Sequence, residues 1–126
     1  MFFNEIVKQI LSPVLESRGF KVTREYKGKV EFSSSRTLFS SSYLEVNFSY
    51  DYSFTKDHGF YICCRTKEET IKCLEDHEIY KLLNLKGNAY EVLSEEEQNM
   101  KYARSLRDLL LEKGDILLNK KAFMNL

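Results

Sequence analysis

Residues 44–54 read Leu-Glu-Val-Asn-Phe-Ser-Tyr-Asp-Tyr-Ser-Phe, and this stretch decides the fold. Apolar and polar side chains alternate along all of it, with the apolar positions at Leu44, Val46, Phe48, Tyr50, Tyr52 and Phe54. A period of two is typical of a β-strand with one buried and one wet face. We therefore predict a long strand whose second face turns to solvent or to a partner, with Glu45, Asn47, Ser49 and Asp51.

The residues before this strand predict a helix followed by a hairpin. Residues 2–18 repeat apolar side chains at helical spacing and end at Gly19, a residue that favours a helix C-terminus. Pro13 either kinks this helix or begins a second short one after Ser12. From Phe20 the period becomes two, and residues 27–29 form a turn before a second short strand that runs to residue 34.

The residues after the long strand predict a fourth strand and then helices. A turn is expected at residues 57–59, and the apolar positions of residues 60–64 continue the sheet as a four-stranded antiparallel meander. Thr66 and Glu69 match a capping box that would open a helix through Leu74, with a break near Asp76 and a new helical phase through Leu82.

A long helix is predicted after a second capping box. Ser94 and Glu97 form that box, and apolar residues then recur on one face through Leu106 and Leu110. Gly114 either ends this helix or lies inside it. The chain is thus predicted to be one α+β domain over residues 1–126, with an N-terminal helix, a four-stranded antiparallel sheet, and two or three C-terminal helices packed on one sheet face.

Charge and composition exclude several classes of function. Nineteen basic and nineteen acidic residues give zero formal net charge, so a nucleic-acid partner is not expected. No apolar run approaches the roughly 20 residues that span a bilayer, and no signal peptide is visible at the start. We expect a cytoplasmic protein without a membrane partner.

Three cysteines, Cys63, Cys64 and Cys73, are expected to be reduced and free of metal. An odd number cannot pair completely, and adjacent strand positions point to opposite faces. Cys73 and His77 would share a helical face as half of a metal site, but a core cysteine beside a surface histidine explains them equally well. A cysteine nucleophile paired with His58 or His77 has no supporting local pattern. We expect no metal and no cofactor.

Carboxylates crowd one part of the chain and are the candidate partner-binding residues. Negative charge at the first turn of a helix is favoured by the helix dipole, which explains many of them. The remaining excess predicts an acidic surface that docks a basic protein partner, together with the open sheet face. The candidate residues are Tyr43, Glu45, Tyr61, Glu68, Glu69, Glu75, Asp76, Glu78, Glu95 and Glu96.

The N-terminal segment carries a resemblance to a known class of protein. Residues 10–15 read Ile-Leu-Ser-Pro-Val-Leu, and residues 18–21 read Arg-Gly-Phe-Lys on entry to the hairpin. This pattern resembles small bacterial proteins that are often immunity proteins of polymorphic toxin systems. The resemblance implies a protein that neutralises a toxin domain by covering it, without chemistry of its own. The alternative function is a small enzyme whose site is assembled from scattered polar residues.

Overall fold

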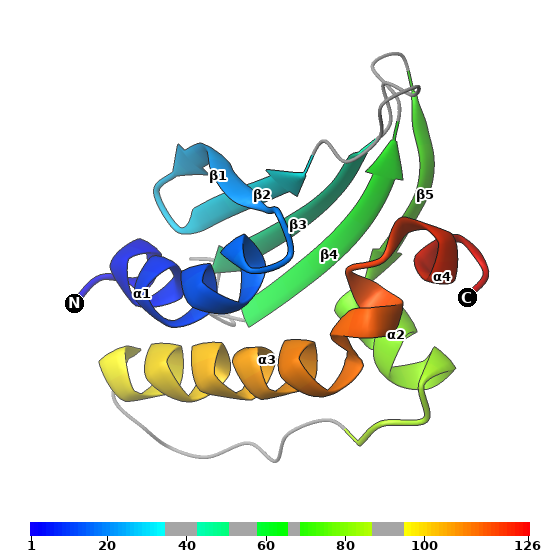
Figure 1. Cartoon of the computed structure of the whole chain (residues 1–126). Coiled ribbons are helices and arrows are strands. Elements are labelled where there is room, and N and C mark those ends of the chain that lie inside the picture. Colours follow the sequence, from blue (N-terminus) through cyan, green and yellow to red (C-terminus); the bar gives the residue numbers. More distant parts are fainter. Residues whose placement is uncertain (35–42, 51–57, 66–68, 87–94) are drawn as a thin grey trace.

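A computed structural model describes residues 1–34, 43–50, 58–65, 69–86 and 95–126. In these ranges a helix precedes a sheet, and further helices follow it (Figure 1). The elements are α1 (Phe3–Glu16), β1 (Lys21–Tyr26), β2 (Lys29–Ser34), β3 (Tyr43–Tyr50), β4 (His58–Arg65), β5 (Thr70–Glu75), α2 (Asp76–Leu82), α3 (Glu95–Leu117) and α4 (Lys120–Met124).

The strands form an antiparallel meander in which each strand pairs with the next along the chain, in the order β1-β2-β3-β4-β5. The central strand is β3, where Val46 lies between Phe32 of β2 and Ile62 of β4. The predicted α+β class, with its N-terminal helix and antiparallel sheet, is confirmed. Residues 52 and 54 of the predicted long strand lie outside the described residues.

The helices form one layer on one face of the sheet, as the sequence predicts (Figure 1). That face presents Val46 and Phe48 of β3, both fully buried, to the apolar sides of α1 and α3. Leu106 of α3 is 2% exposed and belongs to the same core. Val46 and Phe48 therefore lie on the core face that the alternation predicts.

A fifth strand, β5, covers residues 70–74 of the helix predicted from Thr66 through Leu74, and residues 66–68 of that prediction lie outside the described residues. The outer edge of β4 carries unpaired backbone groups, and β5 satisfies them. Leu74 lies opposite Ile62 and is 7% exposed, so this register buries an apolar side chain in the core. The capping pattern at Thr66 favours a helix locally, but the residues that follow it pair with β4, because tertiary contacts override local helix propensity.

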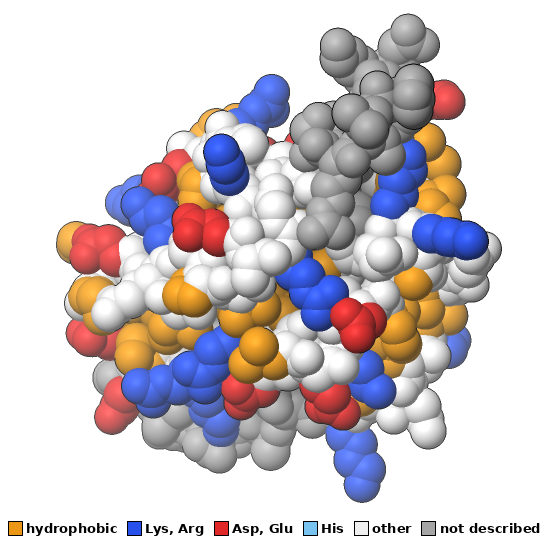
Figure 2. Space-filling model, in the orientation of Figure 1, with side chains coloured by type: hydrophobic (Ala, Val, Ile, Leu, Met, Phe, Trp, Pro, Cys, Tyr) orange, Lys and Arg blue, Asp and Glu red, His pale blue; other side chains and the backbone are white. Residues whose placement is uncertain are grey.

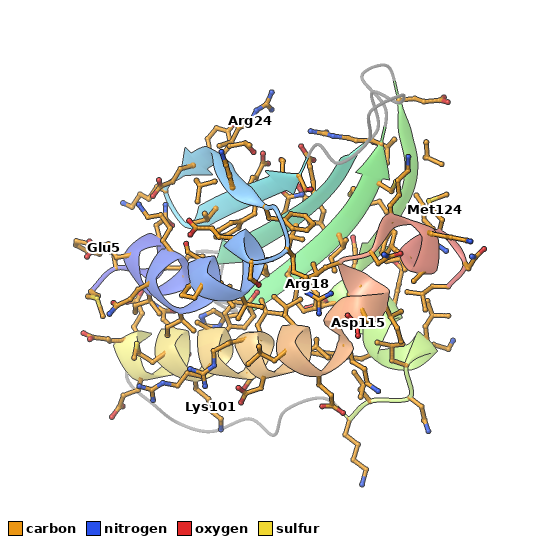
Figure 3. The ribbon with its side chains drawn as sticks, in the orientation of Figure 1. Glu5, Arg18, Arg24, Lys101, Asp115 and Met124 are labelled. Carbon is orange, nitrogen blue, oxygen red and sulfur yellow. A yellow bond between two sulfur atoms is a disulfide. The ribbon has the colours of Figure 1, made fainter. Side chains whose placement is uncertain are left out.

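Three smaller predictions are also resolved. Pro13 lies inside the single helix α1, without starting a second one. Gly114 lies inside α3, where an added Cβ atom would come within 2.9 Å of the Arg18 guanidinium. His58 and Gly59, expected in a turn, instead begin β4. Gly114 thus allows Arg18 to approach α3 and to pair with Asp115 at 2.7 Å (Figure 3).

Candidate functional sites

The sheet face away from the helices carries a network of polar side chains. Lys29 of β2 donates a hydrogen bond of 3.0 Å to the Tyr61 hydroxyl of β4, and it also lies 3.4 Å from the Glu31 carboxylate. Strand β3 lies between β2 and β4, so the Lys29–Tyr61 pair crosses over β3. The hydrogen bond to Tyr61 is the main cause that raises the pKa of Lys29, against the opposing effect of burial.

Asn47 lies beneath this crossing and is fully buried, which corrects the prediction that it faces solvent. Its Cα partners are Glu31 on β2 and Tyr61 on β4, the two residues that contact Lys29. The face is the one predicted, but long side chains from both neighbouring strands cover it. Neither polar atom of the Asn47 amide has a hydrogen-bond partner in the part of the chain that the structure describes.

A polar hollow of about 560 Å³ opens on this side of the sheet, toward the end of β2. Its lining includes Lys21, Thr23 and Arg24 of β1, Ser33 and Ser34 of β2, Glu45 of β3 and Arg65 of β4. Glu45 is 5% exposed, and Arg65 donates a hydrogen bond to its carboxylate. We refer to this feature as the polar hollow.

A second concavity lies between the two long helices, on the outer side of the helical layer. Its volume is about 380 Å³, and its lining includes Ile10, Pro13, Val14, Met100, Arg104 and Arg107. Figure 2 shows apolar side chains along the seam between α1 and α3, with Lys and Arg side chains gathered beside them. We refer to this feature as the α1–α3 groove.

The acidic residues singled out in the sequence lie on several elements. Glu69 precedes β5 and Glu75 ends it, so the extended chain separates them by about 20 Å. Glu95 and Glu96 lie in the first turn of α3. Glu68 lies outside the described residues, as do the surroundings of the Tyr43 side chain.

The acids at residues 75–78 have a structural role that the sequence did not reveal. Glu75 is the N-cap of α2, and its backbone N–H donates a hydrogen bond of 3.1 Å to Glu78. Asp76 accepts a hydrogen bond of 2.8 Å from the backbone N–H of His77. These carboxylates belong to the first turn of α2, where the helix dipole favours them.

Carboxylate and imidazole atoms of Glu75, His77 and Glu78 lie within 4.8 Å of one another, and such a set could hold a metal ion. Glu75 and His77 are exposed, and the capping hydrogen bonds already engage Glu75 and Glu78. The half-site that the sequence suggested from Cys73 and His77 required one continuous helix. Here Cys73 lies in β5 and His77 in α2.

Cys63 and Cys73 form a disulfide, which contradicts the prediction of reduced cysteines. The two residues are Cα partners across β4 and β5, so the unpredicted strand brings them together. Cys64 is the free cysteine, and burial raises the pKa of its thiol, which disfavours a thiolate nucleophile. The cytoplasmic location stays a prediction, and a disulfide does not support a reducing compartment.

His58 packs against α3 and takes part in a partly buried polar contact. Its ring nitrogen Nε2 lies 2.7 Å from the Asn99 side-chain oxygen, and its ring stacks on Tyr102 at 4.6 Å between centroids. The Tyr102 hydroxyl donates a hydrogen bond of 2.8 Å to the Gly59 carbonyl. Burial raises the pKa of Tyr102 well above its ordinary value, so this phenol stays a neutral hydrogen-bond donor.

Comparisons of the chain with models of protein families, with curated proteins and with solved structures found no match. Among the described residues, the helices are too short or too polar to cross a membrane.

Sequence reasoning missed the cations that line both concavities. Lys21 and Arg24 are separated in the sequence from Arg65, and only the sheet register brings them to one hollow. Arg104 and Arg107 were not among the candidate residues, although their i, i+3 spacing puts them on one helix face. That spacing beside Met100 is the signal that could have indicated the groove.

Proposed function

We propose that this chain is a protein-binding module that uses the α1–α3 groove. The observation that carries the proposal is the composition of this groove, which combines an apolar floor with two arginines. Methionine, arginine and aromatic residues are enriched at protein interfaces, and arginine is frequent among the residues that dominate binding energy. A groove between two packed helices also suits an amphipathic helix.

The charge of the groove indicates the chemistry of the partner. Arg104 is exposed and forms no ion pair with any described residue, whereas Arg107 pairs with Asp108 at 3.2 Å. An apolar helix bearing carboxylates would satisfy Arg104 and cover Met100 and Ile10. The proposed partner is therefore an apolar and acidic protein segment. An immunity-like inhibitor that binds a toxin domain is the form of this function implied by the N-terminal resemblance.

The acidic surface predicted from the sequence is the competing docking site, and it would favour a basic partner. Its carboxylates at residues 75–78 accept hydrogen bonds at the start of α2, and this role accounts for their presence without a partner. The enzyme alternative would need a nucleophile or a perturbed acid in a concavity. Glu45 in the polar hollow is held by Arg65, and the pKa of Cys64 is raised.

Selection of binders from a random peptide library displayed on phage tests the proposal. We expect selected peptides to combine apolar and acidic residues, and their affinity to fall at least tenfold for the double variant Arg104→Ala, Arg107→Ala in calorimetry. Arg24→Ala removes an exposed cation on the other side of the sheet and is the matched control, which should bind the peptides unchanged.

The competing site has its own variant. Changing Glu75, Asp76 and Glu78 to Lys should leave binding of the selected peptides intact if the groove is the docking site. The contrary result is selection of basic peptides whose affinity falls with this triple variant and is unchanged with the double arginine variant. That result would show that the acidic surface is the docking site, and it would refute the proposal for the groove.

A further inference from the structure

The polar hollow has an excess of positive charge. Its described lining contains three cationic side chains and one carboxylate, and that carboxylate, Glu45, accepts from Arg65. Lys21 and Arg24 form no ion pair with any residue in the described ranges. Arg24 projects from β1 away from the helical layer in Figure 3. Two cations at the hollow therefore have no ion pair with the described part of the chain, whose full sequence has zero formal net charge.

Hydroxyl groups of the hollow supply further hydrogen-bond donors. Thr23 of β1 and Ser33 of β2 both line the hollow, on the sheet face away from the helices. The hydroxyls of Thr23 and Ser33 bond to each other at 2.8 Å, and one of their two protons stays available to a third group.

We propose that the polar hollow is a binding site for a small ligand that carries a phosphate group. Arginine and lysine side chains donate charge-assisted hydrogen bonds to phosphate oxygens, and serine hydroxyls add neutral ones. These donors come from β1, β2 and β4, so they approach from several directions, which suits a tetrahedral anion better than a planar carboxylate. A volume of about 560 Å³ also leaves room for an organic group attached to the phosphate.

Titration of the ¹⁵N-labelled protein with inorganic phosphate at low salt tests this site, with acetate at equal ionic strength as the comparison. We expect saturable shifts at the backbone amides of Lys21, Arg24, Ser33 and Ser34, with phosphate at least fivefold tighter than acetate. Shifts that do not saturate, or that are equal for the two anions, would overturn the proposal.

Variants separate a built site from general attraction to positive charge. Arg24→Ala and Lys21→Ala should each weaken phosphate binding at least threefold. Glu45→Gln removes the carboxylate that opposes the ligand and should tighten binding, provided that its spectrum stays folded. Arg104→Ala removes an equal charge from the α1–α3 groove and should leave phosphate binding unchanged. A failure of the phosphate site would therefore not bear on peptide binding at the groove.

Adenosine monophosphate distinguishes a phosphorylated organic ligand from free phosphate. Tighter binding than inorganic phosphate assigns the remaining space of the hollow to an organic group. Equal binding assigns the site to free phosphate. Either result supports a phosphate site, whereas loss of binding by the Arg104→Ala variant, with Arg24→Ala unaffected, would refute it.

Discussion

Replacing Asn47 by leucine should stabilise the protein, although Asn47 is a fully buried residue at the centre of the sheet. Both polar atoms of its amide lack hydrogen-bond partners among the described residues. An unsatisfied buried amide costs about 1–3 kcal/mol, and a leucine of similar size removes that cost. In a domain of 126 residues, each kcal/mol of added stability raises Tm by about 3–6 °C.

Asn99→Leu is the matched control, because Asn99 is 3% exposed and its amide is paired. Its side-chain oxygen lies 2.7 Å from the His58 ring, so leucine removes a partly buried hydrogen bond. We expect a loss of about 1–3 kcal/mol, of which the higher helix propensity of leucine offsets about 0.5 kcal/mol. Urea unfolding of the three proteins measures both effects.

The two substitutions should therefore have opposite signs. A loss of stability in Asn47→Leu that equals the loss in Asn99→Leu would refute the reasoning. Such a result would mean that the Asn47 amide is satisfied in solution.

Three further predictions concern stability. Leu106→Ala should cost about 2–5 kcal/mol in denaturant melts, because Leu106 is buried, whereas Leu111→Ala, at a residue that is 62% exposed, should cost little; equal losses would contradict the core assignment. The Cys73→Ser variant should lose about 2–3 kcal/mol and become insensitive to reductant, and wild-type stability that reductant leaves unchanged would exclude the disulfide. Hydrogen bonding to Lys8 lowers the pKa of Glu25 in the folded protein. The stability that this carboxylate contributes is therefore fully present above the ordinary pKa of 4.5 and is lost as the pH falls through the lowered pKa. Carbon-detected NMR titration should show the lowered pKa, and an unshifted pKa would contradict the contact.

Periodic stretches predict this fold because they agree with the tertiary contacts. The alternation around Val46 and Phe48 defines a strand whose apolar face needs a helical layer, and the structure buries both residues there. The stripe through Leu106 predicts α3 for the same reason. Where one period dominates a long segment, local preference and burial favour the same element.

Short segments with mixed signals could not be assigned in this way. The capping pattern at Thr66 favours a helix, but the free edge of β4 selects a strand, and only this pairing brings Cys73 to Cys63. The network above Asn47 includes the hydrogen bond from Lys29 to Tyr61, which crosses an intervening strand. Contacts between residues that are about 30 positions apart leave no trace in local periodicity.

Local charge, and not the net charge of the chain, decides which partners this protein attracts. Interactions between exposed charges are screened beyond about 10 Å at moderate salt, so a carboxylate on α2 cannot offset an arginine across the molecule. The carboxylates at residues 75–78 take part in the start of α2, whereas Arg24 and Arg104 at the two concavities form no ion pair with described residues. Zero net charge therefore coexists with two sites that favour anions. Affinity at both sites should fall as salt rises, and binding that is independent of salt would show that apolar contact alone carries the interaction.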